Sequence, residues 1–121
     1  MQTIYKTRIT KFGSAAFDFM EDKVFVLFGN DAPEDVAEYC LLIELSKVNG
    51  EIQKGDLFRL GGKSYTITSV GNKVALNLQQ LGHITLQFDG KEDEGLPGTL
   101  YLENTAFHKP EIGSEIEIIK K

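Results

Sequence analysis

The sequence contains little of what metal, redox and nucleic-acid sites require. Its single cysteine, Cys40, cannot form a disulfide within the chain, which fits a reducing cytoplasm. The two histidines, His83 and His108, lie far apart and have no second ligand at a metal-binding spacing, so we expect no metal site. The 13 Lys and Arg residues are scattered and outnumbered by 18 Asp and Glu residues, which excludes a clustered phosphate-binding surface. We therefore expect no nucleic-acid partner.

Long hydrophobic runs and common nucleotide or hydrolase motifs are also missing. No apolar stretch approaches the roughly 20 residues that span a bilayer, and we expect no membrane insertion. The N-terminal residues 1–6 carry no apolar signal region, which favours a cytoplasmic location. Neither a GxxxxGK[ST] phosphate loop nor a GxSxG nucleophile elbow occurs, and we expect no cofactor.

What the sequence does contain is enough apolar residues for one core. The chain has 121 residues, of which 41% are hydrophobic, and no shift in composition divides it. This length and composition predict one folded domain over residues 1–121.

Short β-like runs separated by glycine account for most of the chain. Alternating or wholly apolar runs occupy 3–12, 24–28, 41–43, 57–60, 64–70, 83–88, 98–102 and 116–118. Gly61-Gly62 predicts a tight hairpin, and Val74, Leu78 and Leu81 have helical spacing before Gly82, a suitable C-terminal helix cap. The pattern predicts an all-β fold: a small antiparallel barrel-like domain with one or two short helices.

Three runs begin with a similar glycine phrase: Gly55-Asp-Leu-Phe-Arg-Leu60, Gly98-Thr-Leu-Tyr-Leu102 and Gly113-Ser-Glu-Ile-Glu-Ile118. We interpret these phrases as shared turn chemistry and not as an ancestral repeat.

The stretch from Asp31 to Leu45 changes the local pattern and is a candidate site. Asp31 is suited to cap a helix, with Glu34 completing a capping box, and about two turns are expected to end near Cys40. The apolar run 41–43 then predicts a buried strand. A short helix that leads into a buried strand is a plausible place for function in a mostly β chain.

Four other features are weighed for chemistry. Cys40 at the end of the predicted helix is expected to be a buried structural cysteine, because the helix dipole there raises the pKa of a thiol. His83 lies on the polar side of its strand, where it either serves as acid, base or phosphoryl acceptor or only hydrogen-bonds the backbone. The acidic run 92–94 is interpreted as a solvated loop, and His108 as a surface residue.

Several phrases together resemble the glucitol/sorbitol-specific IIA component of the bacterial phosphotransferase system. They occur in the family's order over nearly the whole chain, at 3–13, 32–33, 38–40, 65–71, 77–78, 81–90 and 96–99. The more specific ones are Glu38-Tyr39-Cys40, the run from Leu81-Gly82-His83 to Gly90, and Pro97-Gly98-Thr99.

The resemblance implies a phosphocarrier that takes a phosphoryl group from HPr and passes it to a IIB domain of a IIB/IIC sugar transporter. Aligned on Glu-Tyr-Cys, the family's phospho-accepting histidine falls at Ile43, and a second histidine frequent in relatives falls at Leu45. An isoleucine cannot accept a phosphoryl group, so His83 is the remaining catalytic candidate and the chain is interpreted as a diverged copy. The alternative is a non-catalytic protein-binding or regulatory module on the same fold.

Overall fold

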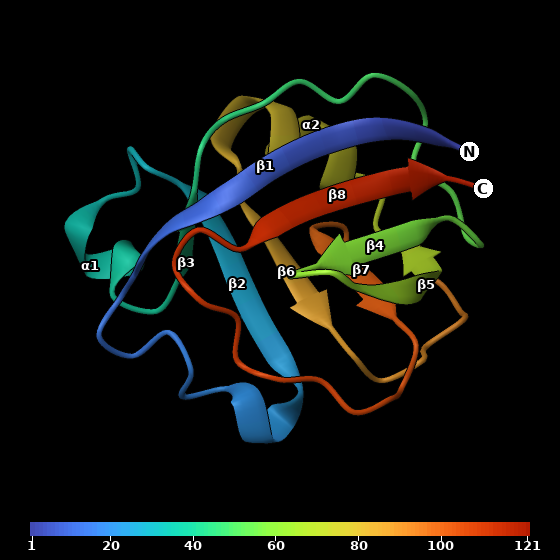
Figure 1. Ribbon diagram of the computed structural model, residues 1–121. Helices are drawn as coiled ribbons and strands as arrows, with labels where there is room; N and C mark the ends of the chain where they lie inside the picture. Colours follow the sequence, from blue (N-terminus) through green and yellow to red (C-terminus); the bar gives the residue numbers. More distant parts are fainter.

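The computed structural model describes residues 1–121 and closes eight strands into one barrel, in the order β1-β3-β2-β6-β7-β5-β4-β8 (Figure 1). The strands are β1 (Gln2–Phe12), β2 (Val24–Gly29), β3 (Leu41–Ile43), β4 (Leu57–Leu60), β5 (Lys63–Val70), β6 (Ile84–Gln87), β7 (Thr99–Leu102) and β8 (Glu115–Lys120). The short helices are the 3-10 turn η1 (Met20–Asp22), α1 (Glu34–Ala37) and α2 (Val74–Leu81). The predicted barrel with short helices is confirmed.

One continuous cluster of buried apolar side chains fills the barrel, and every strand contributes to it. Residues alternate between this interior and the outer surface, as in β6, where Ile84 and Leu86 are buried and their neighbours are half-buried. Phe88, the next residue but one, is buried as well, so the alternation predicted over 83–88 is confirmed. β1 and β8 pair along their length, so the two ends of the chain lie side by side (Figure 1).

The sheet is mixed and not purely antiparallel. Six of the eight strand pairings are antiparallel, but β2 pairs with β3, and β6 with β7, in parallel. Parallel neighbours need a connection that returns to the starting end of the barrel. The segment that contains α1 makes this return between β2 and β3, and residues 88–98 make it between β6 and β7.

The first helix is shorter than predicted and begins later. Pro33, not Asp31, is the N-cap residue, with ψ 142°, and no side chain caps the helix. Backbone before a proline avoids the helical region, so the helix cannot begin at Ala32. It also ends after one turn, because the backbone N–H of Ala15 binds Glu38 O (2.8 Å) and that of Gly13 binds Cys40 O (2.9 Å). The predicted Asp31 cap and second turn are therefore wrong.

The predicted Gly82 cap and Gly61-Gly62 hairpin are confirmed. α2 ends at Leu81, and Gly82 follows in the left-handed region with φ 68°. Gly61 and Gly62, with φ 58° and 90°, join β4 to β5 as a hairpin. None of the helices has the length and hydropathy needed to cross a membrane.

The barrel is built from two similar halves, which we call the first half (β1, β2, β3 with β8) and the second half (β5, β6, β7 with β4). The residues that pair between β1 and β3 have equivalents that pair between β5 and β7, 58 residues later in the first strand and 59 later in the second. Ile9–Ile43 corresponds to Ile67–Leu102, Lys11–Leu42 to Ser69–Tyr101, and Phe12–Leu41 to Val70–Leu100. Both ladders have a register shift at the same place.

The corners before β4 and β8 repeat in the same way. Gly55 and Gly113, 58 residues apart, have φ of 94° and 91°. The next residue accepts an equivalent backbone N–H in each: Asp56 from Gln53 (2.8 Å) and Ser114 from Glu111 (2.9 Å). The glycine phrases at these two corners therefore mark a structural repeat, which the interpretation as turn chemistry alone missed.

Candidate functional site

The position that the resemblance assigns to the family's acceptor histidine lies inside the barrel. Ile43 ends β3, is fully buried, and pairs with Ile9 on one side and Gly29 on the other. Its side chain belongs to the core cluster. A group there cannot reach a protein partner without rearrangement of the strand end.

The two residues after Ile43 leave the barrel and lie at the surface. Glu44 forms an ion pair with Arg8 (Oε1 to Nε, 2.7 Å), and its carbonyl accepts a hydrogen bond from Thr7 Oγ1 (2.6 Å). Leu45, half exposed, covers two glycines: a Cβ added to Gly29 or Gly82 would lie 2.9 or 3.2 Å from Leu45 Cδ2. Through Leu45, the stretch 43–45 thus lies next to Gly82, the residue before His83.

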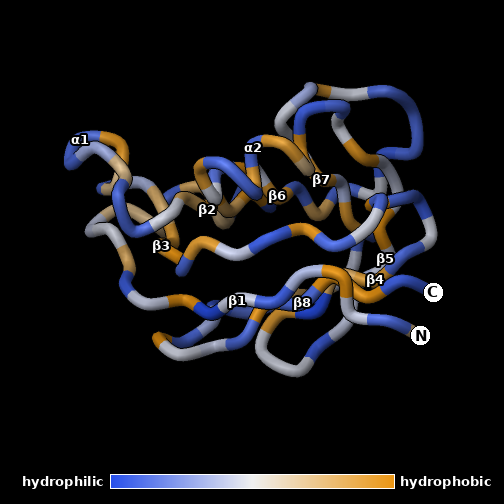
Figure 2. Tube along the Cα trace, turned by 90° about the horizontal axis from the view of Figure 1, so that it is seen from above, coloured by the Kyte–Doolittle hydropathy of each residue, from blue (hydrophilic) through white to orange (hydrophobic).

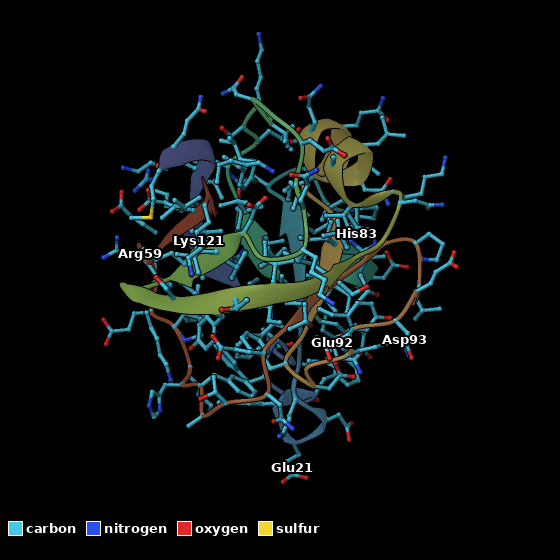
Figure 3. The ribbon with its side chains drawn as sticks, turned by 90° about the vertical axis from the view of Figure 1, so that its right-hand side faces the viewer. Glu21, Arg59, His83, Glu92, Asp93 and Lys121 are labelled. Atoms are coloured by element: carbon cyan, nitrogen blue, oxygen red, sulfur yellow. The ribbon has the colours of Figure 1, made fainter.

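His83 is half-buried, and its ring is held on two sides. Its Nδ1 lies 3.2 Å from Leu27 O, and its ring stacks on Phe28 with centroids 4.4 Å apart. The backbone N–H of His83 bonds Asn77 O of α2 (3.3 Å), and Figure 3 shows the residue beside that helix. The contact with Leu27 O is the kind of backbone hydrogen bond that the sequence allowed as the structural alternative to a catalytic role.

The same hydrogen bond determines which ring nitrogen is reactive. A carbonyl oxygen only accepts hydrogen bonds, so in the neutral ring Nδ1 of His83 carries the proton. Nε2 then holds the free lone pair, and no protein group bonds to it. The arrangement can present a fixed nucleophilic nitrogen from a half-buried ring.

His83 belongs to a row of residues across the outer face of four strands. It lies across from Phe28, which is in register with Leu42 on β3, and Leu42 is in register with Lys11 on β1. Neighbouring strands are about 4.8 Å apart, so Leu42 is two strands, or about 10 Å, from His83.

The far end of this row opens into a cleft of about 710 Å³, which we call the α1 cleft. Its lining residues come from the end of β1, from α1 and from β3: Lys11, Phe12, Gly13, Ser14, Glu34, Asp35, Ala37, Glu38 and Leu42. The strand end abuts the loop after α1 so closely that a Cβ on Gly13 would lie 2.1 Å from Ala37 O. The sequence pattern does not predict this cleft, because Gly13 only ends the apolar run 3–12.

Cys40 is almost completely buried, as predicted, and its Sγ lies 3.3 Å from Val36 O. Burial raises the pKa of the Cys40 thiol. A buried thiol that resists deprotonation is a poor nucleophile, so Cys40 is not a candidate for covalent chemistry.

The remaining candidate residues are dispersed. Glu92 and Asp93 are exposed in the loop between β6 and β7 (Figure 3), and Glu92 pairs with Lys54 at 3.3 Å. His108 is an exposed loop residue. No three His, Cys, Asp or Glu side chains gather closely enough to hold a metal ion.

Known proteins resemble this chain in both sequence and structure. The family model for the "PTS system glucitol/sorbitol-specific IIA component" matches residues 4–117. The glucitol/sorbitol-specific EIIA components of Escherichia coli (strain K12) and Shigella flexneri are each 38% identical over 102 residues, which cover 84% of this chain and 83% of the relative. The crystal structure of a PTS system IIA component from Enterococcus faecalis V583 superposes with a TM-score of 0.84 at 28% identity, covering 96% of this chain and all of the other.

Proposed function

Since this chain belongs to the family of glucitol/sorbitol-specific IIA components of the phosphotransferase system, we propose that it relays phosphoryl groups through His83. In this proposal the protein acts in the cytoplasm during sugar uptake. It accepts the phosphoryl group from HPr and passes it to the IIB domain of a IIB/IIC transporter. The proposal takes the chain as a diverged copy, in which Ile43 replaces the family's phosphohistidine and His83 serves instead.

The observation that supports His83 is its hydrogen bond to Leu27 O, which leaves Nε2 free and fixed in direction. Stacking on Phe28 limits rotation of the ring. A fixed acceptor lowers the entropic cost of bringing two proteins into line for transfer. Leu45, where relatives frequently have a second histidine, lies against Gly82, the residue before His83, so the proposed acceptor is near that surface position.

The transfer requires no metal or cofactor from this chain. The lone pair of Nε2 attacks the phosphorus atom of the donor's phosphohistidine and forms a new N–P bond. The donor's N–P bond breaks, and its electron pair returns to the donor imidazole. The proton on Nδ1 stays on the hydrogen bond to Leu27 O throughout, so His83 carries the phosphoryl group without losing its anchor.

Incubation with phosphoenolpyruvate, enzyme I and HPr tests the proposal. We expect acid-labile phosphate on the wild-type chain, none on His83→Gln, and wild-type labelling on His108→Gln, the matched control with the only other histidine removed. Label on a residue other than His83, or none under conditions that label an active relative, would refute it.

The second candidate function is a non-catalytic binding or regulatory module. Burial of Ile43 in the core, with the carboxylate of Glu44 following it, favours this alternative because neither residue can take or attract a phosphoryl group. A pull-down against HPr and a IIB domain separates the two: binding without labelling supports the module, whereas absence of binding to both excludes it.

A further inference from the structure

The repeat places a crevice at the same position in each half of the barrel. In the first half it is the α1 cleft, between Gly13 and α1. In the second half the equivalent crevice lies between Gly71 and the loop 94–97, and a Cβ on Gly71 would lie 2.2 Å from Pro97 O. The two differ greatly in size, about 710 Å³ against about 110 Å³.

The second crevice is closed by the chain's own side chains. Tyr101, which is equivalent to Leu42, packs so closely on Gly95 that a Cβ there would lie 2.3 Å from the phenol oxygen. That oxygen accepts a hydrogen bond from the backbone N–H of Leu96 (2.9 Å). Ser69, equivalent to Lys11, donates a hydrogen bond to Asp93 O (2.9 Å), which fastens the loop over the crevice.

The α1 cleft has no such internal occupant. Leu42 lacks the ring and hydroxyl with which Tyr101 closes the second crevice, and the exposed side chain of Lys11 makes no hydrogen bond or ion pair. The backbone N–H groups of Val36 and Ala37, equivalent to Gly95 and Leu96, are already bound by Pro33 O at 3.0 and 2.8 Å. The space that the second half fills from within is therefore open to a group from outside.

The lining of the cleft indicates the chemistry of that group. Three of its lining residues are apolar, Phe12, Ala37 and Leu42, and we call them the floor. Its three carboxylates, Glu34, Asp35 and Glu38, are exposed, and we call them the rim. Glu34, Asp35 and Glu38 take part in none of the four ion pairs of the structure, and their one side-chain contact is Ser14 Oγ to Glu38 Oε1 at 3.4 Å. Figure 2 shows hydrophilic residues along the outer turn of α1, at one end of the barrel.

We propose that the α1 cleft receives an arginine side chain presented by a protein partner. The aliphatic stem of arginine covers an apolar floor, and its planar guanidinium donates two parallel hydrogen bonds to a carboxylate, so it fits this combination better than lysine. The charge is complementary, because the three carboxylates of the rim exceed the single Lys11. Leu42 of the cleft lies two strands from His83 on the outer surface of the barrel. The proposal itself does not require phosphoryl transfer.

An NMR titration of the full chain tests this inference with Nα-acetyl-arginine amide as the probe. We expect saturable amide shifts confined to residues 11–14 and 34–42, weaker or absent with Nα-acetyl-citrulline amide, which has the same shape without the charge. The double variant Glu34→Gln/Glu38→Gln should lose most of the response. Glu92→Gln/Glu94→Gln, which removes the same charge from the equivalent loop of the second half, should keep it.

A third variant tests the geometry instead of the charge. Leu42→Tyr places in the first half the side chain that closes the second, and should abolish the shifts while the barrel remains folded. Equal responses to arginine and citrulline, shifts elsewhere on the surface, unchanged binding in Glu34→Gln/Glu38→Gln, or no response at any soluble concentration would each overturn the proposal. Because none of these measurements involves phosphate, their outcome is independent of the labelling of His83.

Discussion

The two halves of this barrel have the same backbone crossing but different side chains around it. In each half a glycine at the end of a long strand, Gly13 or Gly71, lies against the carbonyl of the loop that enters a short buried strand. The outward residue of that short strand is Leu42 in the first half and Tyr101 in the second. The crossing makes the crevice, and in the second half Tyr101, together with the hydrogen bond from Ser69 to Asp93 O, closes it.

The crossing itself should be the least tolerant feature. We expect Gly71→Ala to cost roughly 3 kcal/mol or more of unfolding free energy, because the added Cβ would meet backbone and not a movable side chain. Gly13→Ala should cost less although its added Cβ would come as close to backbone, because the loop opposite has no equivalent of Tyr101 to hold it. Urea denaturation of both variants measures this; equal losses would show that Tyr101 does not stiffen the second crossing.

Opening the second crevice should have the next largest effect. Tyr101→Leu, which copies Leu42, removes a buried ring and leaves the N–H of Leu96 without its partner, at a cost of about 3 kcal/mol. Tyr101→Phe, which removes only the hydroxyl, should cost about 1 kcal/mol. Faster hydrogen exchange at the Leu96 amide in both variants, with the other strands unaffected, would link the loss to the loop; unchanged exchange would contradict it.

The two corners differ in charge, and acid should reveal it. Burial alone raises the pKa of Asp56, but hydrogen bonds from Gln53, Lys120 and Lys121 together lower it below its usual value. A group whose pKa is lower in the folded state stabilises the protein above the unfolded pKa, near 4, and this contribution is lost as pH falls through the folded pKa.

Asp56→Asn should therefore destabilise the protein by about 2 kcal/mol at pH 7, since charge-assisted hydrogen bonds are lost. The difference from wild type should shrink when denaturation is repeated below pH 4. Ser114→Ala, at the equivalent neutral corner, is the control and should show the same cost at both pH values. A pH-independent loss in Asp56→Asn would indicate that its charge is unimportant.

The smallest effect concerns the residues that end the two helical turns before β2 and β6. Lys23 has φ 63° where the second half has Gly82 with φ 68°. A non-glycine residue in this left-handed region costs about 1 kcal/mol, so Lys23→Gly should be stabilising by a few tenths once loss of its contact with Asn104 is included. A lowered melting temperature would show that the side chain contributes more than the strain.

The sequence predicted the elements that short-range patterns determine. Alternation in β6 and the helical spacing before Gly82 are local, and the structure confirms both. The predicted Asp31 cap was wrong because the restriction that Pro33 places on the backbone of Ala32 outweighs the preference of aspartate for the N-cap position.

The features that join distant segments were not predictable from those patterns. The stacking of His83 on Phe28 follows from the pairing of β2 with β6, and the α1 cleft follows from the approach of Gly13 to Ala37. Both depend on strand pairings whose direction the sequence does not encode locally, as the two parallel pairs show. The repeat was visible only as the glycine phrase at Gly55 and Gly113, since the two halves have diverged elsewhere.

The pairing of β1 with β8 has a topological consequence. Tyr5 pairs with Ile118 in the first half, and the equivalent residues Lys63 and Leu60 pair in the second. The two chain ends therefore lie at the corner where the second half has its Gly61-Gly62 hairpin. The ring of strands thus has two equivalent corners, one joined covalently and one closed by hydrogen bonds alone. A circular permutant that links the ends by a glycine turn and opens at Gly61-Gly62 would exchange the two corners and leave the rest of the barrel as it is.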